Sequence, residues 1–299
     1  MFTFQNGYYM AKSDELLKLN DYEALKKKPF NFEYLQNKGF GYSEDINELA
    51  LYQIKSLKKD LFNTLENNPV VKVFFYDIDA VNTKITYKHI HANTNNNTMG
   101  GGNIKVEAIY NALKHNDLSL LELEDKVIFE KLLKFNGSYK EVSEYIDYLF
   151  YVRKYELAKY KELKAYLDLE VTLKNILAII RNSFAGTKVS LLPFGLIEEV
   201  MKVDELVKYA SNLYVGYLEK PLSEFLVDRD LEKLSNEFRK DFYYILKDYE
   251  YEMDSFGIIM LYVYKKMIEL ENIKAIYYNP DISLSELVIL WFMRLDLLR

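Results

Sequence analysis

Apolar side chains recur every three or four residues along most of this chain, which is the spacing of one face of an α-helix. The clearest stripes comprise Leu49, Ile54, Leu57, Leu61 and Leu65, and Leu231, Leu234, Phe238, Phe242 and Ile245. Only 11 of the 299 residues are glycine and 5 are proline, whereas sheet-rich folds need turn-forming residues at short intervals. The sequence therefore predicts an all-α protein of long helices joined by few loops.

The charge and the cysteine count exclude several classes of function. Lys and Arg total 39 against 45 Asp and Glu, a net charge of −6, and this balance disfavours a general nucleic-acid binder. The chain has no cysteine, which excludes disulfides, thiolate catalysis and cysteine-ligated zinc. No apolar run approaches the roughly 18–20 residues of a membrane-spanning helix, and the N-terminus lacks a signal-peptide pattern. We expect a cytoplasmic protein.

Polar and glycine-rich stretches predict where helices begin and end. The segment 91–103 is rich in asparagine and ends close to three glycines, so we expect a loop there, with a helix resuming near Ile104. Ser13 followed by two acidic residues predicts a helix start, and Pro221 and Pro280 predict helix boundaries. The apolar segments Phe256–Met267 and Leu287–Leu298 are expected to be heavily buried.

Three segments of the chain share a pattern centred on an asparagine. The three are Asn82, Asn175 and Asn272, which lie 93 and 97 residues apart. Aliphatic residues stand four positions before and three positions after each asparagine, on the same helix face. Each amide therefore lies in an apolar stripe, where it must find hydrogen-bond partners. The flanking residues are Ile78 and Ile85, Val171 and Ala178, and Ile268 and Ala275.

A glycine at a fixed offset supports the same register. Gly102 and Gly195 each follow their asparagine by 20 residues, and an isoleucine that opens the next helical pattern comes two residues later. The third copy has Asn279-Pro280 instead. A repeat of this length indicates three helical units of roughly 95 residues. We place their approximate boundaries at residues 1–100, 101–195 and 196–299.

These repeated segments resemble a known family. The residues Phe74-Phe75-Tyr76-Asp77, followed by Asn82-Thr83-Lys84, are similar to the repeat of the C subunit of archaeal and bacterial V/A-type ATPases, the family to which the d subunit of the eukaryotic vacuolar ATPase belongs. The segments Leu173–Arg181 and Glu269–Lys274 look like its second and third copies, and Gly7–Lys12 fits the family's opening.

The resemblance implies a non-catalytic coupling protein. In this family three similar helical bundles surround a pseudo-threefold axis and form a cup or funnel. The cup sits on the membrane proteolipid ring, receives the D and F subunits of the central stalk, and transmits torque for proton or sodium transport. The resemblance implies a peripheral location on the cytoplasmic membrane face. It implies no cofactor, metal, nucleic acid or small-molecule substrate.

The resemblance also suggests which residues contact partners. The charged and amide residues of the three copies are the candidates, although the asparagines could instead hold each bundle together through backbone bonds. We leave both roles open for the asparagines. The candidates are Asp77, Asn82, Lys84, Glu170, Asn175, Arg181, Glu271, Asn272 and Lys274.

Other interpretations of the motifs compete with this one. The apolar segment 70–76 followed by Asp77 and Asp79 resembles the first motif of haloacid-dehalogenase-type phosphatases, in which Asp77 would be the nucleophile and Mg²⁺ would assist. His89 and His91 could share a metal only on a strand or loop, and Gly100–Gly102 before a helix could cradle a phosphate. A generic helical-repeat scaffold for another protein is a further alternative.

Overall fold

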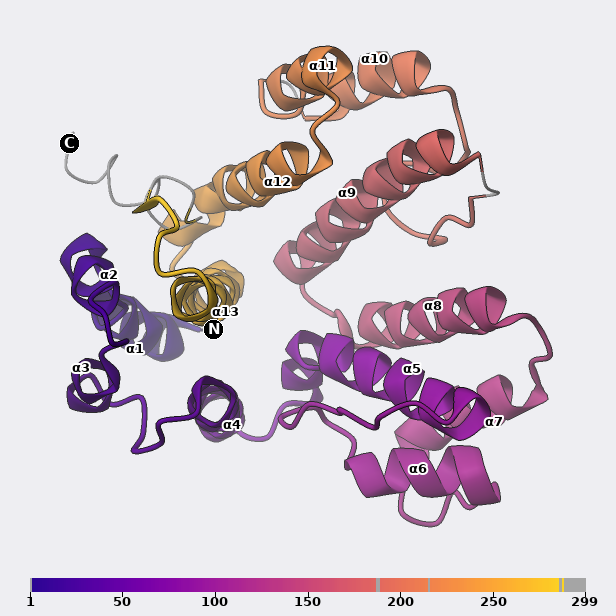
Figure 1. The fold of residues 1–299 in the computed structure, drawn as a ribbon, viewed down its shortest axis with the longest axis horizontal. Coiled ribbons are helices and arrows are strands. Elements are labelled where there is room, and N and C mark those ends of the chain that lie inside the picture. The colour runs from indigo at the N-terminus through magenta and orange to yellow at the C-terminus, as the bar shows by residue number, and fades with distance from the viewer. Residues whose placement is uncertain (1, 187–188, 215, 285–286, 288–299) are drawn as a thin grey trace. The chain divides into compact units, whose positions relative to one another are not determined.

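The computed structural model describes residues 2–186, 189–214, 216–284 and 287, and these contain helices and no strand (Figure 1). The predicted all-α class is therefore confirmed. No helix in these ranges is long and apolar enough to cross a bilayer. Packing divides the chain into two compact units, one comprising residues 1–53 with 160–299 and the other residues 54–159.

The unit of residues 54–159 is a bundle built around α5 (Tyr76–Ala92). The second half of α4 (Ile46–Thr64) and the short 3₁₀ helix η1 (Pro69–Phe74) lead into α5. They are followed by α6 (Val106–His115), α7 (Leu123–Lys134) and α8 (Tyr139–Leu157). Helix α5 packs on α6 and α8, with the aromatic rings of Tyr76 and Phe150 5.8 Å apart in the core.

The other unit is built around α13 (Gly257–Tyr278). Helix α13 packs against α1 (Thr3–Asp14), α2 (Leu19–Leu25), α9 (Lys161–Ala185) and α12 (Leu231–Leu246). The remaining elements are α3 (Phe32–Asn37), α10 (Val203–Leu213), α11 (Glu219–Asp228), the 3₁₀ helix η2 (Lys247–Tyr251) and the first half of α4. Segments from the two ends of the chain thus meet within one unit, because α1 and α2 lie against the last described helix.

Most predicted boundaries match these elements. Helix α5 ends at Ala92 and α6 begins at Val106, so the loop expected at 91–103 is confirmed. Pro221 lies in the first turn of α11, where a missing N–H removes no helical bond. Helix α13 ends two residues before Pro280. Of the segment Phe256–Met267, residues 256–263 are buried as expected, whereas residues 264–267 are of intermediate exposure. Of the segment Leu287–Leu298, only Leu287 lies among the described residues, and its side chain is buried.

The helix start expected at Ser13 is wrong. Ser13 lies near the end of α1, where its hydroxyl donates to the Tyr9 carbonyl at 2.9 Å, and α2 begins only at Leu19. A serine followed by acidic residues fits either end of a helix when the hydroxyl can bond back to the preceding turn. The division into three units at residues 100 and 195 stays a prediction.

Candidate functional site

Asn82 holds the loop that follows its own helix. Its side chain is 1% exposed on α5. Its Nδ2 donates to the Met99 carbonyl at 2.8 Å, and its Oδ1 accepts from the Met99 N–H at 2.7 Å. The connection turns back after Asn93, which adopts a left-handed conformation, and runs along α5 (Figure 1). One amide therefore pairs with both polar groups of one loop residue.

Asn175 does the same on α9. It is also 1% exposed, and it donates to the Leu192 carbonyl at 3.0 Å and accepts from the Leu192 N–H at 2.9 Å. Its Nδ2 lies a further 3.2 Å from the Ile197 carbonyl. The asparagine and its partner are 17 residues apart in both helices. The sequence register of the first two copies therefore corresponds to the same hydrogen-bond pattern.

A second acceptor stands one helical turn before each asparagine. Asp79 accepts from the backbone N–H groups of Asn103 at 2.8 Å and Ile104 at 3.0 Å. Thr172 accepts from the Leu196 N–H through its hydroxyl at 2.8 Å. The separation from Asp79 to Asn103 and from Thr172 to Leu196 is 24 residues in both cases. We call this arrangement the loop clasp: Asp79 and Asn82 with residues 99–104, and Thr172 and Asn175 with residues 192–197.

The two repeated glycines are explained by the clasp. A Cβ on Gly102 would come within 2.1 Å of the Asp79 carboxylate. A Cβ on Gly195 would come within 2.9 Å of both the backbone nitrogen and the hydroxyl of Thr172, and Gly195 has a φ of +80°. Both loops therefore approach their helix too closely for a side chain at this position.

Helix α13 carries a related contact whose partner comes from the other end of the chain. Glu269, three residues before Asn272, is 0% exposed and accepts from the Leu17 N–H at 2.6 Å. Leu17 lies just before α2, 252 residues away in sequence. Asn272 is 4% exposed, and its Nδ2 has no hydrogen bond among the described residues. Burial and the nearby Glu269 carboxylate raise the pKa of the neighbouring Tyr22, and Asn272 opposes that shift.

Burial dominates the electrostatics of the first clasp. It raises the pKa of Asp79 to about 7, against the opposing effect of the Ile104 and Asn103 N–H groups and the nearby Lys58 ammonium. Burial also lowers the pKa of Lys58, whose Nζ donates to the Gly102 carbonyl at 2.6 Å. The clasp is thus a partly desolvated polar cluster that fixes the backbone before α6.

The charged candidates on α5 form ion pairs across to α8. Asp77, which is half exposed, lies 2.8 Å from the Nζ of Lys154, a buried lysine. Lys84 pairs with Asp147. Both pairs join neighbouring helices of this bundle, and each leaves its carboxylate partly open to solvent.

The charged candidates on α9 and α13 are either of intermediate exposure or exposed. Glu170 pairs with Lys174 one turn along α9 at 2.9 Å, and Arg181 is exposed near the end of that helix. Glu271 lies 3.2 Å from Arg239 of α12, with both side chains about half exposed. Lys274 is of intermediate exposure. Glu170 and Glu271 thus have different ion-pair partners, and the asparagines of the first two copies are occupied by backbone.

The phosphatase and phosphate-loop interpretations lose their structural basis. Residues 69–74 form a 3₁₀ helix instead of the strand that the phosphatase motif needs, and the two carboxylates of Asp77 and Asp79 have different partners. The N–H groups that follow the glycines are taken by Asp79. His89 and His91 lie in the last turn of α5, where His89 bonds the Thr94 carbonyl.

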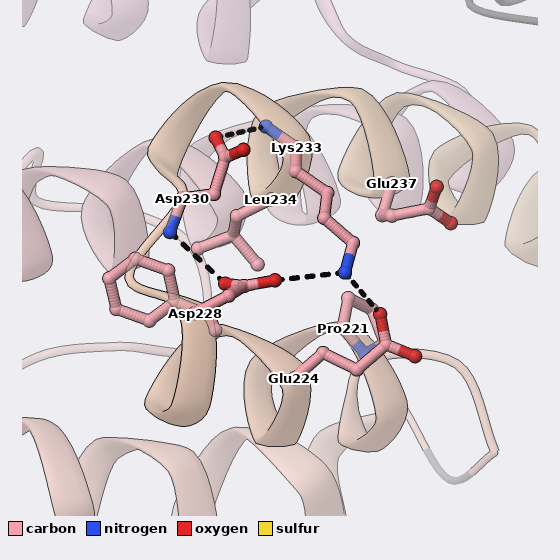
Figure 2. Close-up of a pocket in the computed structure, with 8 residues that line it drawn as sticks. Pro221, Glu224, Asp228, Asp230, Lys233, Leu234 and Glu237 are labelled. Carbon is pink, nitrogen blue, oxygen red and sulfur yellow. Dashed lines mark hydrogen bonds and ion pairs between the residues drawn. The ribbon is translucent and has the colours of Figure 1, made fainter.

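A small hollow lies between α11 and α12 (Figure 2). The Lys233 ammonium reaches across it to Asp228 and Glu224, at 2.9 Å from each carboxylate, as Figure 2 shows. These two carboxylates raise the pKa of Lys233, and that cation in turn lowers the pKa of both acids. The hollow is a surface salt-bridge cluster that the protein's own cation fills.

The role of these backbone acceptors was missed by sequence reasoning. The two clasp acceptors, Asp79 and Thr172, and the related acceptor Glu269 each stand three residues before an asparagine, but they share no residue type. Only the common offset and the common ability to accept a hydrogen bond connect them. Comparison with protein-family models finds no match to this chain, and comparison with curated proteins likewise finds none.

Proposed function

We propose that this protein is a coupling component in the central stalk of a V/A-type rotary ATPase, similar in role to the C subunit of that family. In this proposal three helical units surround a pseudo-threefold axis and seat the axle of D and F subunits on the proteolipid ring. The protein itself is not an enzyme and acts at the cytoplasmic face of the membrane. It transmits torque for proton or sodium transport.

The observation that carries the proposal is the repeated loop clasp. Two helices hold their following loops through an asparagine at the same 17-residue offset and an acceptor at the same 24-residue offset. Independent loops have no reason to share both offsets, so the repeat seen in the sequence has a physical counterpart. Of the residues that resemble the family, Tyr76-Asp77, Asn82-Thr83-Lys84 and Leu173–Arg181 lie in these two helices.

The proposed role requires a stiff protein, and the close packing of the helices is consistent with stiffness. A torque-transmitting part must deform little, and close-packed helices with fixed loops have low compressibility. The clasps tie long connections to helices at buried positions. Ion pairs such as that between Asp77 and Lys154 further link neighbouring helices. These features support a stiff coupling element.

The test is an affinity purification of the tagged full chain from gently detergent-solubilised host membranes, followed by mass spectrometry. We expect the ATPase head, the stalk subunits and the proteolipid to co-purify, with ATP hydrolysis in the eluate. Recovery of the chain alone, or with an unrelated soluble partner, would contradict the proposal and favour the generic scaffold.

A matched pair of charge reversals sharpens this test. Arg181→Glu changes an exposed candidate on α9, and Lys134→Glu makes a comparable change at an exposed position of α7 outside the repeated motifs. We expect Arg181→Glu to lower the yield of co-purified stalk subunits several-fold, and Lys134→Glu to leave it unchanged. Both variants should melt at the wild-type temperature, because exposed substitutions change stability by about 0.5 kcal/mol or less.

A further inference from the structure

The contact on α13 differs from the two loop clasps in how its partner is connected. In α5 and α9 the clasped N–H groups belong to the loop that directly follows the helix. On α13 the N–H that Glu269 binds belongs to Leu17, near the opposite end of the chain. No short connection therefore joins Leu17 to α13, so chain continuity does not keep the two close when the hydrogen bond breaks.

Other contacts extend this junction along the N-terminal segment, residues 2–43. Asn6 is 0% exposed and its Nδ2 donates to the carbonyls of Met253 at 2.6 Å and Ser255 at 2.9 Å. The rings of Tyr9 and Tyr262 lie 5.0 Å apart. Lys28 reaches Asp281 at 3.0 Å beyond the far end of α13. The segment thus contacts the chain from before α13 to beyond it.

Glu269 is the most buried charged group at this junction. It is 0% exposed and pairs with Lys266, whose ammonium also lies 4.4 Å from the Phe40 ring of the N-terminal segment. One carboxylate therefore satisfies a backbone N–H from the N-terminal segment and a cation from its own helix. Removing the carboxylate leaves both donors without that acceptor in a dry environment, which is costly.

We propose that the N-terminal segment packs against the α13 bundle as a separate cooperative unit. The hydrogen bond from the Leu17 N–H to Glu269, which we call the latch, holds it there. The segment opens and closes as one cooperative unit, and it does so before the clasps of α5 and α9 open. The reason is chain connectivity, because a loop joined directly to its helix is held at high local concentration. This inference does not depend on the proposed function.

Native-state hydrogen exchange on the full chain tests the latch. In the wild type we expect the amides of α1–α3 to exchange together, and faster than those of α9. The substitution Glu269→Leu should speed exchange in α1–α3 by about 10- to 100-fold and leave α5 and α6 unchanged. Glu269→Gln keeps an acceptor for the Leu17 N–H, so its effect should be several-fold smaller.

Thr172→Val is the matched control, because it deletes the acceptor for the Leu196 N–H in a clasp whose loop is continuous with its helix. It should leave exchange in α1–α3 unchanged. If Glu269→Leu does not fold, Asn6→Ala opens the same junction from its other end and should speed α1–α3 selectively. The latch is overturned if these variants speed exchange uniformly along the chain, or leave α1–α3 at the wild-type rate.

Discussion

An asparagine side chain carries a donor and an acceptor on one amide, so it can pair with both the N–H and the C=O of one backbone residue. Asn82 and Asn175 use this property in the same way, each on a loop residue 17 positions later. A leucine at either position would fit the surrounding apolar stripe but would leave the loop backbone unpaired. Each position therefore requires a side chain with both a donor and an acceptor, as the asparagine amide has, and not merely a polar side chain.

Asn175→Leu should destabilise the fold. Each buried backbone group left unpaired costs roughly 1–3 kcal/mol, and the Leu192 N–H and carbonyl both lose their partner. We expect a loss of about 3 kcal/mol in the free energy of unfolding, measured by urea denaturation. Arg181→Ala, at an exposed position of the same helix, is the control. An unchanged midpoint for Asn175→Leu would mean that water replaces the amide.

Asp79 gives stability a specific pH dependence. Its pKa is raised to about 7 in the folded protein by burial, from an ordinary value of 3.8, so the native state binds more protons than the unfolded state between these values. The free energy of unfolding should therefore fall as pH rises from about 4 to 7, by at most ~1.4 kcal/mol per pH unit from this group.

The variant Asp79→Asn should flatten that slope. Burial also raises the pKa of Asp241 to about 7. This group adds the same pH dependence to the stability of both proteins, so its contribution cancels in the comparison. Urea denaturation of wild type and variant at pH 5 and pH 8 measures the difference. Parallel pH profiles would show that Asp79 is not the titrating group.

At the scale of elements, a loop is fixed where its backbone can approach a helix closely. Gly195→Ala should destabilise by two separate effects, the positive φ and the contact of Cβ with Thr172. Gly186→Ala is the matched control, because Gly186 has a φ of +61° and nothing within 4 Å of its Cβ position. We expect about 1 kcal/mol for the control and roughly 1–3 kcal/mol more for Gly195→Ala, from thermal melts. Equal losses would mean that the loop moves away freely.

Element positions were largely predictable, because helix periodicity and glycine or asparagine clusters act over a few residues. The stripe of α12 and the loop before α6 follow from the sequence directly. The clasp acceptors were not predictable, because an aspartate and a threonine serve one geometric role at one offset. The prediction at Ser13 failed because a hydroxyl caps a helix start and bonds back at a helix end with the same local sequence.

At the scale of the whole molecule, the sequence repeat predicts similar units but not how the chain ends are used. The first two asparagines bond backbone 17 residues onward, whereas the acceptor before the third bonds an N–H 252 residues upstream. No local pattern reports a contact of that separation, since either chain end could have packed elsewhere. This bond lies within the spatial grouping of residues 1–53 with 160–299.

A nick in the chain tests whether that grouping needs covalent continuity. The turn before α4 is accessible, since Tyr42 is 93% exposed, and a protease site inserted between Ser43 and Glu44 can be cut in the folded full chain. The released piece would carry Tyr9, Tyr22 and Leu35, all 0% exposed. Burial of each such side chain contributes roughly 1.5–3 kcal/mol, so we expect the piece to co-elute with the remainder in gel filtration.

The same nick in a chain carrying Asn6→Ala and Glu269→Leu should release the N-terminal piece, because the polar bonds of the junction are then missing. Separation of the pieces in the otherwise unchanged chain would mean that the backbone link, and not the packing against α13, holds the N-terminal segment in place.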